Sequence, residues 1–246
     1  MTAVLVIAGS DSSGGAGLTR DVQTLAHLGV GALCALTAVT AQSDTRVTTV
    51  YPLPADIVRA QIAAALATRR VGAVKIGMLA TGAAVTAVAD SLPPRSAVPL
   101  VLDPVLAASS GGALLEAAGH AALREVLLPR VTLLTPNIPE AAALLGEPVA
   151  HGEEELLRQG CALLTLGPEA VLLKGGHGDG PLATDLLLTA RAAPLRLTAP
   201  RSTAVRRGTG CTLATAIAAA LARGLELTAA CERAKQYVTD FIQHGG

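Results

Sequence analysis

The stretch Val4-Leu5-Val6-Ile7-Ala8, followed by the glycine-rich residues 9–17, decides how the rest of the chain is read. Its first five residues are apolar and mostly β-branched, which is typical of a strand buried on both faces of a parallel sheet. From Leu18 to Leu28 apolar residues recur at helical spacing, and Gly29 suits a helix end. The segment therefore predicts a strand, a loop and a helix in succession.

The same alternation continues along the 246 residues. Apolar runs predict strands over 31–39, 47–53, 71–76, 99–102, 131–134 and 170–174. Helical spacing predicts helices over 56–68, 83–92, 113–128, 140–145, 153–166, 211–222 and 228–243. Two further strands, 184–189 and 194–198, are adjacent and predict an antiparallel pair. We therefore expect one domain over 1–246, with an α/β fold whose mostly parallel sheet is covered on both faces.

Composition narrows the possible functions. Nineteen basic and nineteen acidic side chains give no net charge, which indicates neither a nucleic-acid partner nor an anionic membrane. One phenylalanine, two tyrosines and no tryptophan leave little for stacking on nucleobases. No basic region precedes the first short apolar run, and apolar runs stay below eighteen residues. We expect a soluble, cytoplasmic protein that acts on a small molecule.

The four cysteines show no paired metal spacing. Cys34, Cys161 and Cys231 fall within apolar elements, where we expect small buried thiols. Cys211 is expected on a polar loop instead.

Ligands of such folds bind at the carboxyl ends of strands, so the polar loops after strands are the candidate site. The loop 9–17 is not a Walker loop, because Gly15 stands where the lysine would follow Gly14. It is not a dinucleotide fingerprint either, because Arg20 occupies the third glycine position. Its place between a strand and a helix favours a shaped binding loop over a flexible linker.

Two polar residues near this loop have alternative interpretations. Asp21 is expected in the first helical turn, where the helix dipole stabilises a carboxylate with or without a ligand. Gln42 carries an amide that suits a ring nitrogen and an exocyclic amine, but it could equally face solvent.

Three residues further along point to phosphate or metal chemistry. Asn137 and Glu140 have the spacing of a capping box, and the same pair could hold Mg²⁺ through water. Lys174 ends a very apolar strand, where it could meet phosphoryl oxygens or extend its ammonium group to solvent.

The stretch Arg207-Gly208-Thr209-Gly210-Cys211-Thr212 opens into an apolar helical pattern over 213–221. The first N–H groups of a helix lack partners within it and carry partial positive charge, so a phosphate can bind there. The alternative is an ordinary helix start capped by threonine.

A set of motifs extends over nearly the whole chain: Gly9-Ser10-Asp11 with Gly14–Gly17, Thr40-Ala41-Gln42, Lys75-Ile76-Gly77-Met78, Asp103-Pro104-Val105, Thr135-Pro136-Asn137, Lys174-Gly175-Gly176-His177 and Gly208-Thr209-Gly210-Cys211. In order and spacing this set closely resembles the hydroxymethylpyrimidine and phosphomethylpyrimidine kinases of thiamine biosynthesis, in the ribokinase-like superfamily. The resemblance implies a three-layer αβα sandwich with little or no lid, a homodimer, and two ATP-dependent steps. These convert 4-amino-5-hydroxymethyl-2-methylpyrimidine to its monophosphate and then to the diphosphate.

The resemblance also implies roles for individual residues. The aminopyrimidine would be held by Gly9, Ala16, Asp21, Gln42 and Met78. ATP and its phosphates would meet Asn137, Lys174, Thr209 and Gly210, with Mg²⁺ held near Asn137 and Glu140 through water. Catalysis would fall to Lys174 and to the turn Gly208, Thr209, Gly210 and Cys211, with Cys211 as the base. A helix N-terminus lowers a thiol pKa from about 8.5, so we expect appreciable thiolate near neutral pH.

Some positions depart from the family pattern. Arg207 replaces a usual histidine, Ser43 replaces a common asparagine, and the loop 107–111 often carries a charged residue in the family. Two alternatives stay open, a pyridoxal kinase and a non-catalytic pyrimidine-binding module. Cysteine at 211, where most pyridoxal kinases have aspartate, favours the pyrimidine.

Overall fold

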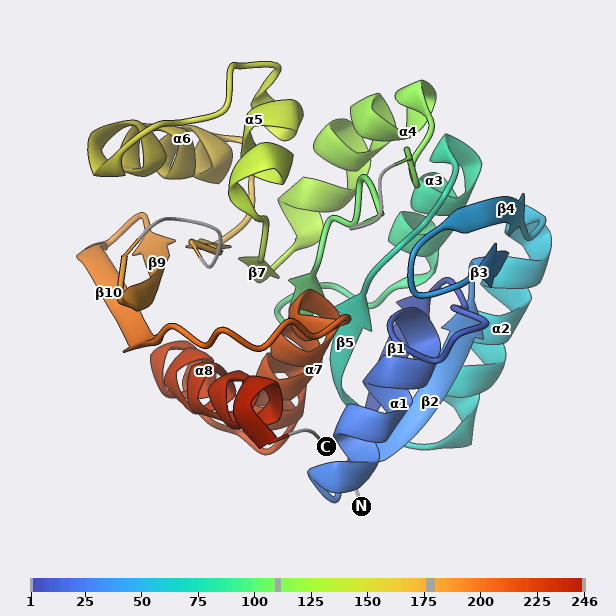
Figure 1. The fold of residues 1–246 in the computed structure, drawn as a ribbon. Coiled ribbons are helices and arrows are strands. Elements are labelled where there is room, and N and C mark those ends of the chain that lie inside the picture. Colours follow the sequence, from blue (N-terminus) through green and yellow to red (C-terminus); the bar gives the residue numbers. More distant parts are fainter. Residues whose placement is uncertain (1, 109–111, 176–179, 245–246) are drawn as a thin grey trace.

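The computed structural model describes residues 2–108, 112–175 and 180–244. An eight-stranded sheet forms its centre, in the order β10-β9-β8-β7-β6-β5-β1-β2 (Figure 1). The strands are β1 (Ala3–Ala8), β2 (Gly31–Leu36), β5 (Val71–Ile76), β6 (Leu100–Leu102), β7 (Leu133–Leu134), β8 (Ala170–Leu173), β9 (Leu182–Thr189) and β10 (Ala192–Pro200). Strands β2, β1, β5, β6, β7 and β8 pair in parallel in this order, and β9 and β10 add an antiparallel edge, which confirms the predicted sheet.

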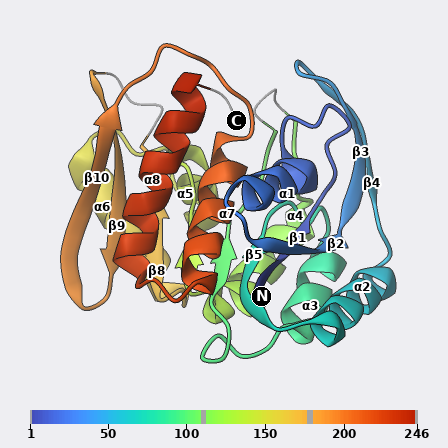
Figure 2. The same cartoon turned by 90° about the horizontal axis from the view of Figure 1, so that it is seen from below.

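Helices cover both faces of the sheet (Figures 1 and 2). One face carries α1 (Gly17–His27), α7 (Thr209–Ala222) and α8 (Leu227–His244). The other carries α2 (Ala55–Thr68), α3 (Gly82–Ser91), α4 (Ala117–Ala122), α5 (Ile138–Leu145) and α6 (Glu153–Thr165). The predicted three-layer sandwich is therefore confirmed. None of the helices in the described ranges combines the length and apolar character that a membrane span needs.

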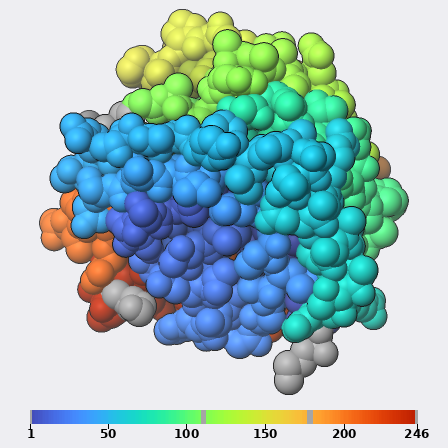
Figure 3. Space-filling view, turned by 90° about the vertical axis from the view of Figure 1, so that its right-hand side faces the viewer, coloured from blue at the N-terminus to red at the C-terminus, as the bar shows by residue number. Residues whose placement is uncertain are grey.

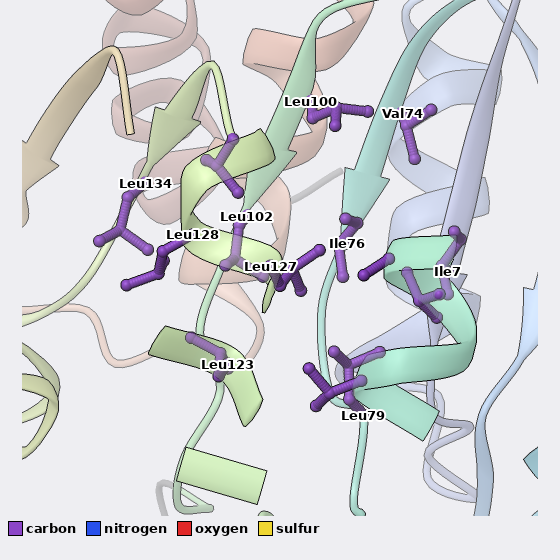
Figure 4. Packing of buried hydrophobic residues seen from close by; sticks show 14 of the residues in the cluster. Ile7, Val74, Ile76, Leu79, Leu100, Leu102, Leu123, Leu127, Leu128 and Leu134 are labelled. Atoms are coloured by element: carbon purple, nitrogen blue, oxygen red, sulfur yellow. The ribbon is translucent and has the colours of Figure 1, made fainter. Parts of the chain in front are cut away.

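The alternation of side chains along the strands divides the core into two apolar layers. In β1, Leu5 and Ile7 join the layer under α2–α6, and Val4, Val6 and Ala8 join the layer under α1, α7 and α8. Figure 4 shows the first layer, in which strand residues such as Ile76 and Leu102 meet Leu127. Each large side chain buried here contributes about 1.5–3 kcal/mol. A core of Leu, Val, Ile and Ala thus replaces the aromatic residues that the chain largely lacks.

One predicted strand is wrong in its extent. The residues 31–39 are not one buried strand, because β2 ends at Leu36 and β3 (Ala38–Gln42) belongs to a separate hairpin with β4 (Val47–Pro52). Thr37 makes the junction, and its hydroxyl donates to the Met78 carbonyl at 2.6 Å. In the space-filling view the hairpin residues lie against the N-terminal segment (Figure 3). The hairpin contributes Gln42 to the lining of a cavity at the end of β1.

The predicted helix over 113–128 starts late and changes its winding. It begins at Ala117, continues as a π-helical turn (Leu123–Leu127) and closes with a short 3₁₀ turn (Leu128–Arg130) that contains Pro129. Ala113 and Leu115 instead form isolated bridges with Ala107 and Ala80, which holds them out of the helix.

The cysteine predictions hold only in part. Cys231 is buried in α8 as expected, but Cys34 and Cys161 are exposed. Cys34 lies on β2, the edge strand of the sheet, and an apolar neighbourhood in sequence does not say which way a side chain points. Cys211 lies in the first turn of α7 rather than on a loop.

A buried ion pair joins β5 to the helices of the α7 face. Lys75 Nζ lies 2.7 Å from Asp21 Oδ2, and both side chains are fully buried. The other Asp21 oxygen accepts a 2.7 Å hydrogen bond from the hydroxyl of Thr215 in α7. The prediction that Asp21 lies in the first turn of the helix is wrong, because α1 starts at Gly17 and has no acidic residue in its first turn. Lys75, rather than the helix dipole, stabilises the Asp21 carboxylate.

We predict that Lys75→Met lowers the free energy of unfolding by about 3–5 kcal/mol, because it leaves the Asp21 carboxylate buried without its partner. Urea denaturation followed by circular dichroism measures this loss. Arg158→Met is the control, since its pair with Glu147 at 2.5 Å is exposed to solvent and should contribute much less to stability. Equal losses in the two variants would contradict the structural role of the buried pair.

Candidate active site

The strand order reverses between β1 and β5, and a cavity of about 70 Å³ opens at their carboxyl ends. Such a switch point is where open α/β sheets bind ligands. The described residues that line it come from the loop after β1, the hairpin, the loops after β5 and β6, and the start of α7: Gly9, Ser10, Asp11, Ala16, Gly17, Gln42, Met78, Ala108, Leu114, Arg207 and Gly208. The structure thus brings together the predicted residues Gly9, Ala16, Gln42, Met78 and Gly208.

Asp21 does not share this position. It is fully buried in the pair with Lys75, so the predicted contact between Asp21 and a substrate is not supported. A second cavity, of about 240 Å³, lies between α7 and α8 and contains none of the predicted residues. Size alone therefore does not mark the functional site in this fold.

The loop 9–17 has a defined shape. Gly17 has a φ of +59°, and a Cβ there would lie 2.5 Å from the Gly9 carbonyl oxygen. Asp11 Oδ1 accepts hydrogen bonds from the Ser13 N–H at 2.9 Å and the Ser13 hydroxyl at 2.7 Å. Both ends of the loop are therefore fixed, as the interpretation as a binding loop requires.

The first turn of α7 is open to a ligand. Gly208 is the N-cap residue, with a φ of +74° and no side chain, so the alternative of a capping threonine is not observed. The N–H groups of the following residues, Thr209, Gly210 and Cys211, point out of the helix end, where partial positive charge collects. A Cβ at Gly208 would clash with the Gly15 carbonyl oxygen, so the loop 9–17 and the turn touch through backbone alone.

Lys174 lies beside this turn. Its Nζ is 2.7 Å from Asp103 Oδ1 and 3.9 Å from Glu140 Oε2. A Cβ at Gly210 would lie only 3.2 Å from the same Nζ. Burial by itself would lower the pKa of Lys174, but Asp103 and Glu140 raise it above its usual value. A cation therefore stands next to the open helix end at neutral pH.

Asp103 and Lys75 were not predicted as functional residues, although both lie in the quoted motifs. A signal existed in the alternation of the strands. Each charged residue lies two positions after an apolar residue of the layer under α7 and so points to the same face of the sheet. The pairs are Ala73 and Lys75, Val101 and Asp103, and Leu172 and Lys174. The three charged side chains thus lie on the α7 side of the sheet.

Asn137 and Glu140 form the predicted capping box at the start of α5. The Glu140 N–H donates to Asn137 Oδ1 and the Asn137 N–H donates to Glu140 Oε2, both at 2.8 Å. Burial raises the pKa of Glu140, while Lys174 opposes this shift. The capping box does not exclude Mg²⁺ binding through water, because each of the two side chains has a second polar atom besides the one used in the cap.

The described residues contain no cluster of three or more His, Cys, Asp or Glu side chains that could hold a metal on its own. Mg²⁺ at nucleotide sites needs only one or two carboxylates besides phosphate and water. Asp103 and Glu140, whose carboxylate oxygens lie 2.7 and 3.9 Å from Lys174 Nζ, could meet that need. Gly176, His177 and residues 109–111, named in the sequence motifs, lie outside the described residues.

The expectation of a Cys211 thiolate is wrong for this structure. Burial raises the pKa of the Cys211 thiol to about 11. Lys75 and a hydrogen bond from the Gly17 N–H lower this pKa, but Asp21 and Asp103 raise it further. Desolvation thus outweighs the helix N-terminus, and the thiol is protonated at neutral pH.

Two of the three departures from the family pattern lie close together, because Arg207 bonds to Asp44, the neighbour of Ser43. Arg207 lines the cavity, and Ser43 closes the turn of the hairpin through its N–H, which donates to the Arg46 carbonyl at 2.9 Å. Ser43 therefore shapes the hairpin, whereas Arg207 faces the site.

An open helix end, a neighbouring lysine and a small cavity at a switch point are together the features of a small-molecule phosphotransferase. The comparisons with known proteins agree. The model of the phosphomethylpyrimidine kinase family matches residues 11–246. Hydroxymethylpyrimidine/phosphomethylpyrimidine kinase of Rhizobium meliloti (strain 1021) is 46% identical over 240 residues, which cover 97% of this chain and 90% of the relative.

Solved structures give the same result. The crystal structure of phosphomethylpyrimidine kinase from Clostridium difficile 630 superposes with a TM-score of 0.85 at 36% identity, covering 98% of this chain and 100% of the other. Pyridoxal kinase from Staphylococcus aureus, in complex with AMP-PCP and pyridoxal, has a TM-score of 0.87 at 30% identity, covering 99% of this chain and 88% of the other. The chain belongs to the phosphomethylpyrimidine kinase family, and the predicted ribokinase-like fold is confirmed.

We predict that Gly208→Ala lowers kcat/KM by about 100-fold or more, because the clash with Gly15 moves the turn away from the loop. Gly224→Ala is the matched control at the other end of α7. Gly224 has a φ of +85° but open space around it, so only backbone strain of about 1–2 kcal/mol is added. Activity and urea unfolding of both variants measure the difference. Similar activities would contradict the close approach.

Proposed function

We propose that this chain transfers phosphate from ATP to 4-amino-5-hydroxymethyl-2-methylpyrimidine, and then to the monophosphate to form the diphosphate, in thiamine biosynthesis. The supporting observation is the open turn Gly208–Cys211, which lies between Lys174 and the cavity after β1. Family membership and the printed activities of the relatives support the same assignment. Phosphate donor and pyrimidine acceptor would then meet across the turn.

The cavity offers what an aminopyrimidine needs. The Gln42 amide can donate and accept, which matches an exocyclic amine beside a ring nitrogen. Met78 and Leu114 supply apolar contact to the ring, and the backbone of Gly9 and Ala16 completes the wall. The acceptor hydroxymethyl group would then point to the turn.

On the donor side the residues must stabilise phosphate oxygens and position the nucleotide. The N–H groups of Thr209, Gly210 and Cys211 and the Lys174 ammonium supply positive charge there without reorganisation. Asn137 would contact the nucleotide, as the resemblance implies. Mg²⁺, when bound near Glu140 and Asp103 and partly through water, would neutralise charge on the phosphate oxygens.

The two steps differ in what they ask of Cys211. In the first step the hydroxymethyl oxygen forms a bond to the γ-phosphorus, the bond to the ADP oxygen breaks, and the hydroxyl proton must pass to a base. Cys211 as thiolate would accept it. In the second step the acceptor is a phosphate that is already ionised at pH 7, so a base is not required.

We predict that Cys211→Ala lowers kcat of the first step by about 100- to 10,000-fold, the usual range for a general base, and that of the second step by less than about tenfold. Coupled ADP release with each purified acceptor measures both. Cys161→Ala, at an exposed cysteine of α6, is the control and should behave as the wild type. Equal losses in the two steps would contradict the role of Cys211 as the base.

We predict that kcat/KM of the first step rises about tenfold per pH unit between pH 7 and pH 9. The sign follows from the base, because a thiol with a pKa of about 11 gains thiolate in proportion to pH throughout this window. The rate of the second step should vary little with pH, since the phosphate acceptor has its second pKa at about 6. A first step that does not vary with pH would show that the Cys211 thiolate is not the base.

The function itself is tested by ATP consumption with hydroxymethylpyrimidine, its monophosphate and pyridoxal as acceptors. The proposal expects turnover of both pyrimidines and a lower kcat/KM for pyridoxal. Preference for pyridoxal would support a pyridoxal kinase, and pyrimidine binding without ATP consumption would support a non-catalytic module. The homodimer and the cytoplasmic location that we expected stay predictions, which size-exclusion chromatography and cell fractionation can check.

A further inference from the structure

Arg207 connects three elements around the cavity. Its NH1 donates to Ser13 Oγ at 2.7 Å and to Asp44 Oδ1 at 2.9 Å, and its NH2 donates to Asp11 Oδ2 at 3.1 Å. Ser13 and Asp11 belong to the loop after β1, and Asp44 lies at the tip of the β3–β4 hairpin. The guanidinium also packs over Gly15, where a Cβ would lie 3.0 Å from NH1. Arg207 therefore directly precedes the phosphate-binding turn Gly208–Cys211, and its guanidinium lies against the loop after β1.

The two carboxylates that hold Arg207 are not equivalent. The Asp11 side chain is 3% exposed, so it is a fixed partner. The Asp44 side chain is 82% exposed, and an ion pair this open to solvent contributes little to stability. Asp44 can therefore be replaced by another anion at small cost, while Asp11 keeps the guanidinium in place.

The acceptor changes its charge between the two steps. The free pyrimidine presents a neutral hydroxymethyl group, whereas the monophosphate brings a group of about −1.5 to −2 charges into the same cavity. Among the described residues that line the cavity, Arg207 is the only cation. A guanidinium presents a planar fork of N–H donors that matches phosphate oxygens.

We infer that Arg207 is a specificity-determining residue, whose guanidinium exchanges the Asp44 carboxylate for the phosphate of the phosphorylated pyrimidine and so favours the second step. This inference rests on the proposed function. The exposed carboxylate occupies the place of the substrate phosphate until the monophosphate binds. Lys174 and the turn then remain available for the phosphoryl group that is transferred.

The test compares KM for the monophosphate with KM for the free pyrimidine in four variants. Arg207→Met should raise KM for the monophosphate about 10- to 100-fold more than KM for the free pyrimidine, the range for a hydrogen-bonded charge. Arg207→Lys should restore part of the loss, because it keeps the charge but not the fork. Asp44→Ala should lower KM for the monophosphate about two- to fivefold, because it removes the competing anion.

Arg46→Met is the control for general electrostatics, because Arg46 is exposed on the same hairpin turn and should leave the ratio of the two KM values within about twofold. If Arg207 only joined the loop to the hairpin, Arg207→Met and Asp44→Ala would change KM for the monophosphate in the same direction. That result would overturn the inference. So would an equal rise of both KM values in Arg207→Met. A wild-type enzyme that phosphorylates neither pyrimidine would instead refute the proposed function, and the role of Arg207 with it.

Discussion

The contact on which the site depends is the approach of the Gly208 backbone to the Gly15 carbonyl. No side chain fits between them, and this allows the loop after β1 to lie directly against the first turn of α7. The two segments come from opposite ends of the chain, and Arg207 bonds to Asp11 across 196 positions of sequence. The fold brings the loop after β1 and the first turn of α7 together because β1 lies next to β5 and because α1 and α7 lie side by side on one face of the sheet (Figure 1). Acceptor cavity and phosphate-binding turn thereby become neighbours.

Buried charge supports this arrangement from the sheet. The pairs Lys75–Asp21 and Lys174–Asp103 both lie on the α7 side, each at 2.7 Å. Such pairs contribute little net stability compared with apolar residues of similar size, although breaking one is costly. We attribute the Lys174–Asp103 pair to function, because it fixes a cation beside Gly210 in the first turn of α7, whereas Lys75 neutralises Asp21 inside the core. Burial above all keeps the pKa of Cys211 high, and Asp21 and Asp103 add to this shift against Lys75, so the assembled site does not favour a resting thiolate.

Much of the fold and part of the site could be predicted from sequence, because a segment's local pattern is clear where the segment is buried throughout or where its contacts are local. The apolar run Val4–Ala8 is buried on both faces, and the N-x-x-E spacing at 137–140 gives the capping box. The motifs also led to the cavity residues Gly9, Gln42 and Met78. Predictions failed where a property depends on distant partners. The partners of Asp21 are Lys75 and Thr215, the exposure of Cys34 follows from an edge position, and the Cys211 pKa depends on burial by the assembled site.

A crystal structure with hydroxymethylpyrimidine and a non-hydrolysable ATP analogue would test the central claim most directly, namely that the loop 9–17 and the start of α7 form one donor–acceptor site. Our account predicts the pyrimidine beside Gln42 and Met78, with its hydroxymethyl group facing the γ-phosphate over the N–H groups of Thr209–Cys211. A pyrimidine bound in the cavity between α7 and α8, or a γ-phosphate held away from this turn, would contradict it.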